Sequence, residues 1–357
     1  MQIGRAYAVD FRNYRALSLT PAPRLNVLSG ANGQGKTNLL EALGLLVTGR
    51  SFRTPRTAEI PRWGSWSTSV TGDLVRADGA SVARRTLRRT IERRDDGNWQ
   101  NGGESVEWAR AIAFGWQDLE IVNGAPLARR SFIDGFTGRL YPAHLKALIE
   151  FRQLLARRNR LLQQRSGDVA TRAQLEPWNE QFATVGMDLV NRRRRAVAAL
   201  QTELARVYGA LCAARSKVEI RYRTALGEAS EAAALLAALE GAQREELRRG
   251  QTLVGPHRDD LAIEIDGIDA RTFGSRGQQR LVALALRLAE VLPVTEAAGT
   301  APVLLLDDAL SELDPAVREQ VVRELGAAEQ VFLTTPEPPA VKGAAVFYVH
   351  AGGVAAA

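Results

Sequence analysis

A glycine-rich segment near the start of the chain has the spacing of a phosphate-binding loop. It fits the pattern G-x-x-x-x-G-K-[ST], and an ordinary glycine-rich turn is the alternative interpretation. Such glycines let backbone N–H groups converge on a phosphate at the start of the following helix. Lys36 would place its positive charge on the β- and γ-phosphates of a nucleotide, and the Thr37 hydroxyl would bind Mg²⁺. The predicted nucleotide site comprises Gly30, Ala31, Asn32, Gly33, Gln34, Gly35, Lys36 and Thr37.

Two adjacent acids in the last quarter of the chain fit the other half of such a site. The apolar run Val303–Leu306 leads directly into Asp307 and Asp308. A buried strand that ends in an acid places a carboxylate beside the phosphate loop, where we expect Asp307 to hold Mg²⁺. Asp308 is then placed to polarise an attacking water. Buried strands often end in acids, so the pair predicts a catalytic site only in combination with the loop.

Two further motifs resemble those of the ABC-type ATPases. Ser275, Gly277 and Gln278 match the Ser-x-Gly-Gln of the ABC signature and precede a long apolar helix, while Ser311–Asp314 follows the acidic strand like an ABC D-loop. The alternative for each is helix capping, since Ser275 with Gln278 fits a capping box and Asp314 precedes a proline. Four motifs in this order favour the ABC interpretation. The resemblance implies that the signature serine reaches the nucleotide held by a second subunit, which makes ATP the switch of a dimeric clamp.

The elements that must position these motifs are predicted by hydrophobic periodicity. Strands and helices alternate at both ends of the chain, and two long helical patterns occupy the middle on either side of the polar stretch 166–174. We expect strands at 2–9, 25–28, 67–77, 82–93 (a hairpin turning at Asp78-Gly79), 217–223, 261–265, 303–306, 330–333 and 346–350. We expect helices at 38–47, 142–164, 175–213, 227–248, 275–292 and 315–325.

This order of elements predicts an α/β fold built from both chain ends, with a short inserted α-helical arm. Together with this fold, the resemblance of the four motifs implies an ABC-type (P-loop) ATPase head. The expected segments are 1–125 for the N-terminal part of the head, 126–249 for the basic helical arm, and 250–357 for the C-terminal part of the head.

Composition excludes several other classes of protein. The 357 residues include 47 Lys and Arg against 40 Asp and Glu, giving a net charge of +7, and the hydrophobic content of 45% is that of a globular protein. One cysteine, Cys212, and three histidines are too few for an internal disulfide or a Cys/His metal cluster. The chain has no signal-like start and no uncharged run long enough for a membrane span, so we predict a cytoplasmic protein.

The excess positive charge lies in the predicted arm. Residues 126–165 hold nine Lys and Arg against two acids, and four more arginines follow at 192–195. Such clustering favours contacts with DNA phosphates. The alternative is that the charged groups are solvated while their aliphatic stems cover apolar surface. The candidate DNA-binding residues are Arg129, Arg130, Arg152, Arg157, Arg158, Arg160, Arg192 and Arg193.

Several blocks along nearly the whole chain are similar to those of the RecF family. They are FRNYR at 11–15, GRSFRT at 49–54, VNGAP with RRSFID at 122–134, and TLVGPHRDD at 252–260. The resemblance implies an ATP- and Mg²⁺-dependent DNA-binding protein of replication and recombinational gap repair. It would form an ATP-dependent homodimer at gaps and junctions of single-stranded and duplex DNA, with weak DNA-stimulated ATP turnover. It would assist RecA loading with RecO and RecR, and SOS induction.

Two places in the chain leave alternatives open. The family usually has Pro-Glu-Asp-Leu at the position of Trp116-Gln117-Asp118-Leu119, so Gln117 is a candidate Q-loop residue and the substitution leaves that role open. The loop Gly255–Asp260 is either a turn with local hydrogen bonds or a segment whose His257 and Arg258 couple DNA contact to the nucleotide. Two other functions are alternatives for the whole chain: the ATPase subunit of a RecF-like nuclease-associated defence system, and a transporter subunit, which the basic insertion disfavours.

Overall fold

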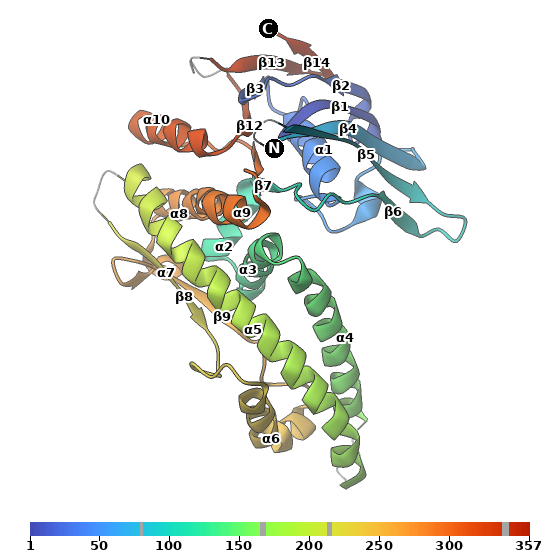
Figure 1. Cartoon of the computed structure of the whole chain (residues 1–357), viewed down its shortest axis with the longest axis vertical. Coiled ribbons are helices and arrows are strands. Elements are labelled where there is room, and N and C mark those ends of the chain that lie inside the picture. Colours follow the sequence, from blue (N-terminus) through green and yellow to red (C-terminus); the bar gives the residue numbers. More distant parts are fainter. Residues whose placement is uncertain (79–80, 165–168, 213–215, 338–342) are drawn as a thin grey trace. The chain divides into compact units, whose positions relative to one another are not determined.

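The computed structural model describes residues 1–78, 81–164, 169–212, 216–337 and 343–357, which form two compact units (Figure 1). The first comprises Met1–Asp118, Gly209–Ala214 and Arg280–Ala357, and the second Leu119–Tyr208 and Arg215–Gln279. The second unit is thus an insertion into the first. It includes residues 250–279, which were expected to belong to the head, because β9 (Asp260–Ile265) pairs with β8 (Val218–Arg223) of the same unit.

A six-stranded sheet in the first unit draws its strands from both ends of the chain. Its order is β14-β13-β3-β12-β11-β7, and all neighbours are parallel except the edge strand β14. The bounds are β3 Leu25–Ser29, β7 Ala111–Phe114, β11 Val303–Leu306, β12 Gln330–Thr335, β13 Ala345–His350 and β14 Gly353–Ala356. This confirms the α/β head built from both ends. The carboxyl ends of β3, β11 and β12 lie at one edge, where ligands bind in such sheets.

The second sheet of this unit is antiparallel, in the order β2-β1-β4-β5-β6. The bounds are β1 Gln2–Phe11, β2 Tyr14–Leu19, β4 Ser67–Asp78, β5 Ser81–Arg93 and β6 Trp99–Gly103. The expected hairpin of β4 and β5 is confirmed by their pairing, although Gly79 of its turn lies outside the described residues.

Helix α1 (Lys36–Thr48) forms the centre of the core of the first unit. Its apolar side chains are buried on nearly every face, as expected for a helix enclosed by other elements. One hydrophobic cluster joins Leu39 of α1 to Val70 of the antiparallel sheet and Leu305 of the parallel sheet. Helix α1 is therefore held by both sheets, which fixes the position of the loop that precedes it.

The C-terminal helices of the chain are α8 (Arg276–Ala289), α9 (Val291–Ala298) and α10 (Pro315–Glu324). The boundary between the two units falls inside α8, before Arg280. A single helix was expected over 275–292, and the prediction was wrong in its last turn. Pro293 has no N–H to donate to the carbonyl of Ala289, so α8 ends there and a new helix begins. In its described residues, the first unit also has short 3₁₀ helices at Thr57–Glu59, Trp116–Asp118 and Leu325–Ala327.

The second unit consists mainly of helices around a small sheet, β10-β9-β8. Its elements are α2 Leu119–Asn123, α3 Pro126–Leu140, α4 Ala143–Gln163, α5 Val169–Leu211, α6 Ala232–Arg249, α7 Ala270–Phe273 and β10 Ile268–Asp269. Long helices α4 and α5 pack together (Figure 1), and the rings of Phe151 and Phe182 lie 4.7 Å apart. Helix α5 begins at Val169, within the polar stretch 166–174 that was expected to separate the two long helices. No helix in the described parts of the chain is long and apolar enough to cross a membrane.

Candidate nucleotide-binding site

The glycine-rich segment forms a tight loop between the end of β3 and the start of α1. Gly30, Gly33 and Gly35 all have positive φ, of 153°, 81° and 114°. At Gly30 a Cβ would lie 2.3 Å from the carbonyl oxygen of Val349, and at Gly35 it would lie 2.6 Å from the Asn13 Nδ2. These two positions therefore require glycine for steric as well as conformational reasons. The loop runs directly into the first turn of α1, so the backbone N–H groups of the loop and of the helix N-terminus lie together, the arrangement that binds phosphates.

The Lys36 side chain folds back over this loop. Its ammonium group donates to the carbonyl oxygens of Gly30 and Ala31, the second at 3.0 Å. Burial lowers the pKa of Lys36, and the nearby carboxylates of Asp308 and Asp307 partly oppose this effect. A lysine held at the loop in this way presents its charge where the loop would hold a phosphate.

The acidic pair lies beside the loop, as its spacing after the apolar strand predicted. Asp307 directly follows β11, and the Thr37 hydroxyl lies 2.9 Å from each of its carboxylate oxygens, although 270 positions separate the two residues. The Thr334 hydroxyl donates to Asp307 Oδ1 at 2.8 Å. Hydroxyl and carboxylate oxygens are ligands suited to Mg²⁺, which proteins usually bind through one or two carboxylates together with substrate phosphates. The donor set of Thr37 and Asp307 therefore fits a Mg²⁺ site.

Asp308 is held in an uncommon backbone conformation. Its φ is 52°, and its N–H donates to the Thr334 hydroxyl at 2.8 Å. The Ser311 hydroxyl, in the segment that resembles a D-loop, lies 2.8 Å from Asp308 Oδ2. Arg280 donates to the Asp308 carbonyl and to Ser311, both at 2.7 Å. A non-glycine residue with positive φ beside a catalytic motif is typical of functional sites, where neighbouring contacts maintain the strain.

The phosphate loop is braced by residues that the motifs did not point to. The buried Tyr14 hydroxyl donates to the Gly35 carbonyl at 3.0 Å, and Asn13 Nδ2 donates to the Gln34 carbonyl at 3.2 Å. On the other side, the backbone N–H of Ala351 donates to Gln34 Oε1 at 2.7 Å. Asn13 and Tyr14 belong to one of the RecF-like blocks, so a signal existed for them. A backbone donor in the β13–β14 turn had none.

A buried carboxylate on α1 ties two RecF-like blocks, the one just described and a second, to the site. Glu41 is fully buried and accepts two bonds from Arg12, at 2.8 and 2.6 Å. It also accepts from Arg53 at 3.2 Å and from the Ser51 hydroxyl at 2.5 Å. Paired and hydrogen-bonded in this way, a buried charge is tolerated. The blocks at 11–15 and 49–54 are therefore held to the helix that follows the phosphate loop.

Gln117 lies in the 3₁₀ helix after β7. Its amide donates to the Arg53 carbonyl at 3.4 Å, a long hydrogen bond. A Cβ on Gly115 would contact both Gln117 Oε1 (3.4 Å) and the Asp307 Cβ (3.9 Å), so the backbone at Gly115 lies next to both. This places Gln117 in the neighbourhood of the acidic pair, and its role in sensing Mg²⁺ stays a prediction.

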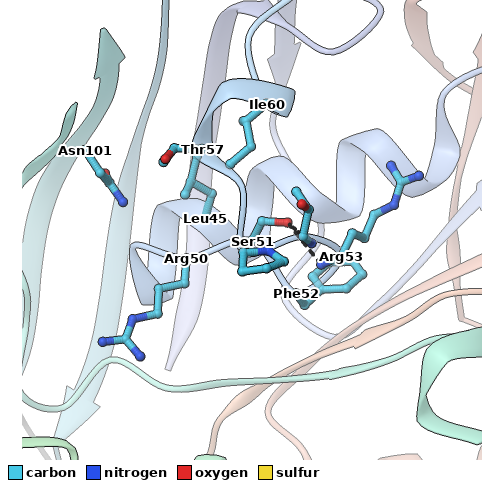
Figure 2. Close-up of a pocket in the computed structure, with 10 residues that line it drawn as sticks. Leu45, Arg50, Ser51, Phe52, Arg53, Thr57, Ile60 and Asn101 are labelled. Carbon is cyan, nitrogen blue, oxygen red and sulfur yellow. Dashed lines mark hydrogen bonds between the residues drawn. The ribbon is translucent and has the colours of Figure 1, made fainter. Parts of the chain in front are cut away.

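A cleft of about 490 Å³ lies at the other end of α1 (Figure 2). Its lining is Leu45, Arg50, Ser51, Phe52, Arg53, Thr54, Pro55, Thr57, Ile60 and Asn101, so it is separate from the phosphate loop. The Ser51 hydroxyl accepts the backbone N–H groups of Arg53 and Thr54, at 3.0 and 3.1 Å. Figure 2 shows Ser51 next to Phe52 and Arg53 in the lining of the cleft. The cleft shares Ser51 and Arg53 with the Glu41 network.

The signature-like residues cap a helix in the manner of the alternative interpretation. The Ser275 N–H donates to Gln278 Oε1 at 2.9 Å, and the Gln278 N–H lies 3.3 Å from the Ser275 hydroxyl. This is a reciprocal capping box at the start of α8. Gly277 has open space around it, since a Cβ there would meet no atom within 4 Å. Capping explains the local sequence, and the role of Ser275, Gly277 and Gln278 toward a nucleotide stays a prediction.

Three of the candidate DNA-binding arginines are buried in ion pairs of the second unit. Arg129 makes two bonds to Asp260, at 2.7 and 2.8 Å. The other two pairs are Arg158 with Glu246, at 2.6 Å and fully buried, and Arg193 with Asp134, at 2.8 and 2.9 Å. A guanidinium that is buried and paired has no free face for a DNA phosphate. The hypothesis of DNA contact is therefore withdrawn for these three residues.

The other candidate arginines differ in accessibility. Arg130 is half-buried and donates to the Asp259 carbonyl at 2.9 Å, and Arg192 is half-buried and pairs with Asp188 at 2.7 Å. Arg152, Arg157 and Arg160 on α4 are exposed, and the Arg157 guanidinium lies 5.3 Å from the ring centre of Trp178. Exposed cations of one helix are the part of the set suited to DNA.

The loop Gly255–Asp260 is bound into the second unit by its own polar groups. The Arg258 N–H donates to the Gly255 carbonyl at 2.9 Å, and the half-buried His257 ring lies 3.2 Å from the Thr252 carbonyl and packs against Phe151 and Phe182. Burial lowers the pKa of His257 to about 4. These contacts agree with the simpler interpretation, a turn with local hydrogen bonds.

The chain is similar to known proteins along nearly its whole length. A family model described as an AAA domain matches residues 9–124. The chain is 34% identical to the DNA replication and repair protein RecF of Heliobacterium modesticaldum over 99% of this chain and 98% of that protein. It is 35% identical to the RecF of Myxococcus xanthus, over 99% of this chain and 97% of that protein.

Solved structures give the same grouping. A structure described as the recombination mediator protein RecF with ATP in the RecFOR pathway matches with a TM-score of 0.86 and 27% identity, over 99% of this chain and 97% of that one. An Smc head bound to the C-terminal winged-helix domain of ScpA matches with a TM-score of 0.55 at 14% identity, covering 100% of this chain and 97% of that one, which indicates a shared fold alone.

Proposed function

The chain belongs to the RecF family of DNA replication and repair proteins, and from this premise we propose that it is an ATP-dependent DNA-binding protein of recombinational gap repair. One observation carries the proposal. Thr37 of the phosphate loop and Asp307 of the acidic strand, 270 positions apart, meet at 2.9 Å. Two motifs with complementary roles toward a nucleotide are therefore assembled in one place.

ATP is the proposed ligand, in line with a solved relative described as RecF with ATP. Backbone N–H groups of Gly30–Thr37 would bind the phosphates, and Lys36 would offset their charge. Mg²⁺, held by Thr37 and Asp307, would supply further neutralisation of the phosphate charge. Asp308, restrained by Ser311 and Thr334, would orient and deprotonate the attacking water.

We expect nucleotide binding to act mainly as a dimerisation switch. Ser275, Gly277 and Gln278 would bind the ATP held by a second copy of the chain, with the positive end of α8 directed at the γ-phosphate. Hydrolysis would then separate the copies. Turnover would be slow and stimulated by DNA, so that it times release.

DNA would bind through its phosphates and without sequence specificity. The exposed arginines 152, 157 and 160 of α4 are the proposed contacts, with the half-buried Arg130 and Arg192 as secondary ones. The proposed targets are gapped DNA and junctions of single-stranded and duplex DNA. The proposed partners are RecO, RecR and RecA, and the proposed outcomes are RecA loading and SOS induction. Relatives described as members of the RecFOR pathway support this choice.

Sedimentation velocity with and without ATP and Mg²⁺ tests the switch. ATP should increase the dimer fraction of the unmodified protein, whereas Lys36→Arg, which keeps the charge but not the compact ammonium group, should stay monomeric. A monomer that ATP leaves unchanged would contradict the switch. No observation on the described residues specifically favours the alternative of a nuclease-associated defence ATPase.

A further inference from the structure

A buried hydroxyl on a third strand connects the two acids of the site. Thr334 lies near the end of β12, the strand between β3 and β11, and only 2% of its surface is exposed. Its hydroxyl donates to Asp307 Oδ1 at 2.8 Å and accepts the backbone N–H of Asp308, also at 2.8 Å. The same oxygen therefore contacts both residues of the acidic pair.

The contacts of Asp307 give this hydroxyl a distinct role. Thr37 has one proton to share between two carboxylate oxygens that are both 2.9 Å away, so it does not by itself select an orientation. Thr334 bonds Oδ1 alone. This bond fixes the rotation of the carboxylate group and leaves Oδ2 with Thr37 as its only hydrogen-bond partner among the described residues.

The sheet explains why the hydroxyl lies there. Parallel pairing sets Leu333 of β12 opposite Leu306 of β11, so the next residues, Thr334 within β12 and Asp307 just after β11, lie at the same level. On its other side Thr334 is in register with Leu28 of β3, two residues before the phosphate loop. The position of Thr334 is therefore set by the same backbone ladder that positions the loop and the acids.

We propose that Thr334 is a positioning residue that orients the Asp307 carboxylate for the Mg²⁺ bound with nucleotide and couples that orientation to the backbone of Asp308. The inference rests on the proposed ATP site. Groups that hold a metal ligand in place typically change metal affinity by about 10- to 100-fold when they are removed. Nucleotide binding without metal should not depend on Thr334, because its hydroxyl contacts the acids and not the phosphate loop.

The test uses three variants of the full chain. Thr334→Val keeps the shape and removes the hydroxyl, and Thr334→Ser keeps the hydroxyl. Thr335→Val is the matched control, because it removes the neighbouring hydroxyl, which bonds the Glu337 carbonyl at 2.7 Å and not the acids. Thr334→Cys, whose thiol is a weak donor, replaces the valine variant if that variant does not fold.

Equilibrium binding of a fluorescent, non-hydrolysable ATP analogue is measured by anisotropy, first in EDTA and then across a Mg²⁺ series. For Thr334→Val the EDTA affinity should match that of the unmodified protein, while the Mg²⁺ concentration for half-maximal enhancement should rise about 10-fold or more. Thr334→Ser and Thr335→Val should both follow the unmodified protein.

An unchanged Mg²⁺ dependence in folded Thr334→Val would overturn the inference and leave the ATP site standing. An equal change in Thr335→Val would also overturn it, since the effect would then belong to the strand and not to this hydroxyl. Failure of the unmodified protein to bind the analogue under any condition would contradict the proposed function itself.

Discussion

Sequence reasoning predicted which residues meet at the phosphate loop, but it did not predict which arginines of the helical unit are exposed. In the first unit, residues chosen for their type and spacing meet: Thr37 contacts Asp307, and Asp308 contacts the D-loop-like Ser311. In the second unit, residues chosen because charge clusters along the chain separate into buried and exposed groups. The spacing of residues within a motif reflects the three-dimensional arrangement that the motif forms. The density of charge along the chain does not indicate which side of a helix faces the core.

Breaking the buried ion pair between Arg158 and Glu246 should have the largest effect on stability. Both side chains are fully buried, and Arg158 also bonds Asn179 and Thr252, each at 2.8 Å. Arg158→Met should lower the free energy of unfolding of the second unit by about 3–5 kcal/mol, because Glu246 would be left as an unpaired buried charge. Urea unfolding followed by circular dichroism measures this, and the double variant with Glu246→Leu should recover part of the loss. A stable single variant with weakened DNA binding would return Arg158 to the DNA-binding set.

Asp308 provides the corresponding test for the nucleotide site. Asp308→Asn should reduce ATP turnover by about 10²- to 10⁴-fold, because the amide cannot accept a proton from the attacking water. Binding of the ATP analogue should be retained. Steady-state phosphate release and anisotropy give the two readouts. Unchanged turnover would remove Asp308 from the catalytic role and leave the pair with a binding function alone.

The half-buried His257 should make the stability of the second unit depend on pH. Its pKa is lowered to about 4 by burial, so the folded state resists protonation while the unfolded chain takes up a proton below about pH 6.5. Stability should therefore fall as pH falls through this interval, by about 2 kcal/mol between pH 7 and pH 5. Urea unfolding of the unmodified protein and of His257→Leu should differ in this slope, with the exposed His350→Gln as the control. Equal slopes in all three would show that burial of His257 carries no such penalty.

The exposed arginines of α4 should give the smallest effect per residue. Reversal of Arg152, Arg157 and Arg160 to glutamate should weaken DNA binding and flatten its dependence on salt, by a slope of about 0.9 for each DNA phosphate that the variant no longer binds. ATP binding should be unaffected. The matched control reverses Arg244, Arg248 and Arg249 of α6, which changes the net charge of the same unit equally. Equal weakening in both triple variants would attribute the effect to net charge.

Much of the fold followed from periodicity. Strands β1, β3, β4, β5, β8, β9, β11, β12 and β13 and helices α1, α4, α5, α6 and α10 were all expected, and their bounds differ from the expected ones by six residues at most. Helices α2, α3 and α7 and strands β2, β6, β7, β10 and β14 were missed. Most of these elements are short, and α3 is rich in glycine and arginine, so their periodic signals are weak. The break between α8 and α9 follows from Pro293, because a proline inside a helical pattern removes a backbone donor.

Those parts of the site that belong to sequence motifs were predictable. The phosphate loop and the acidic pair have fixed spacing, so their meeting was foreseen, including the Thr37–Asp307 contact in outline. Thr334 and Ala351 were not foreseen, because a single threonine at a strand end and a backbone N–H in a turn have no distinguishing pattern. Burial of Arg129, Arg158 and Arg193 depended on acids far away in sequence, such as Glu246 for Arg158. Pairing of this kind is decided by tertiary packing.

The central claim is that nucleotide at the Lys36 loop controls binding to DNA. The most direct measurement is the affinity for labelled gapped, single-stranded and duplex DNA, by anisotropy at fixed salt, with and without ATP and Mg²⁺. For the unmodified protein ATP should tighten binding, most strongly to gapped DNA, and Lys36→Arg should lose this increase. Equal affinity with and without ATP for every DNA form would contradict the claim.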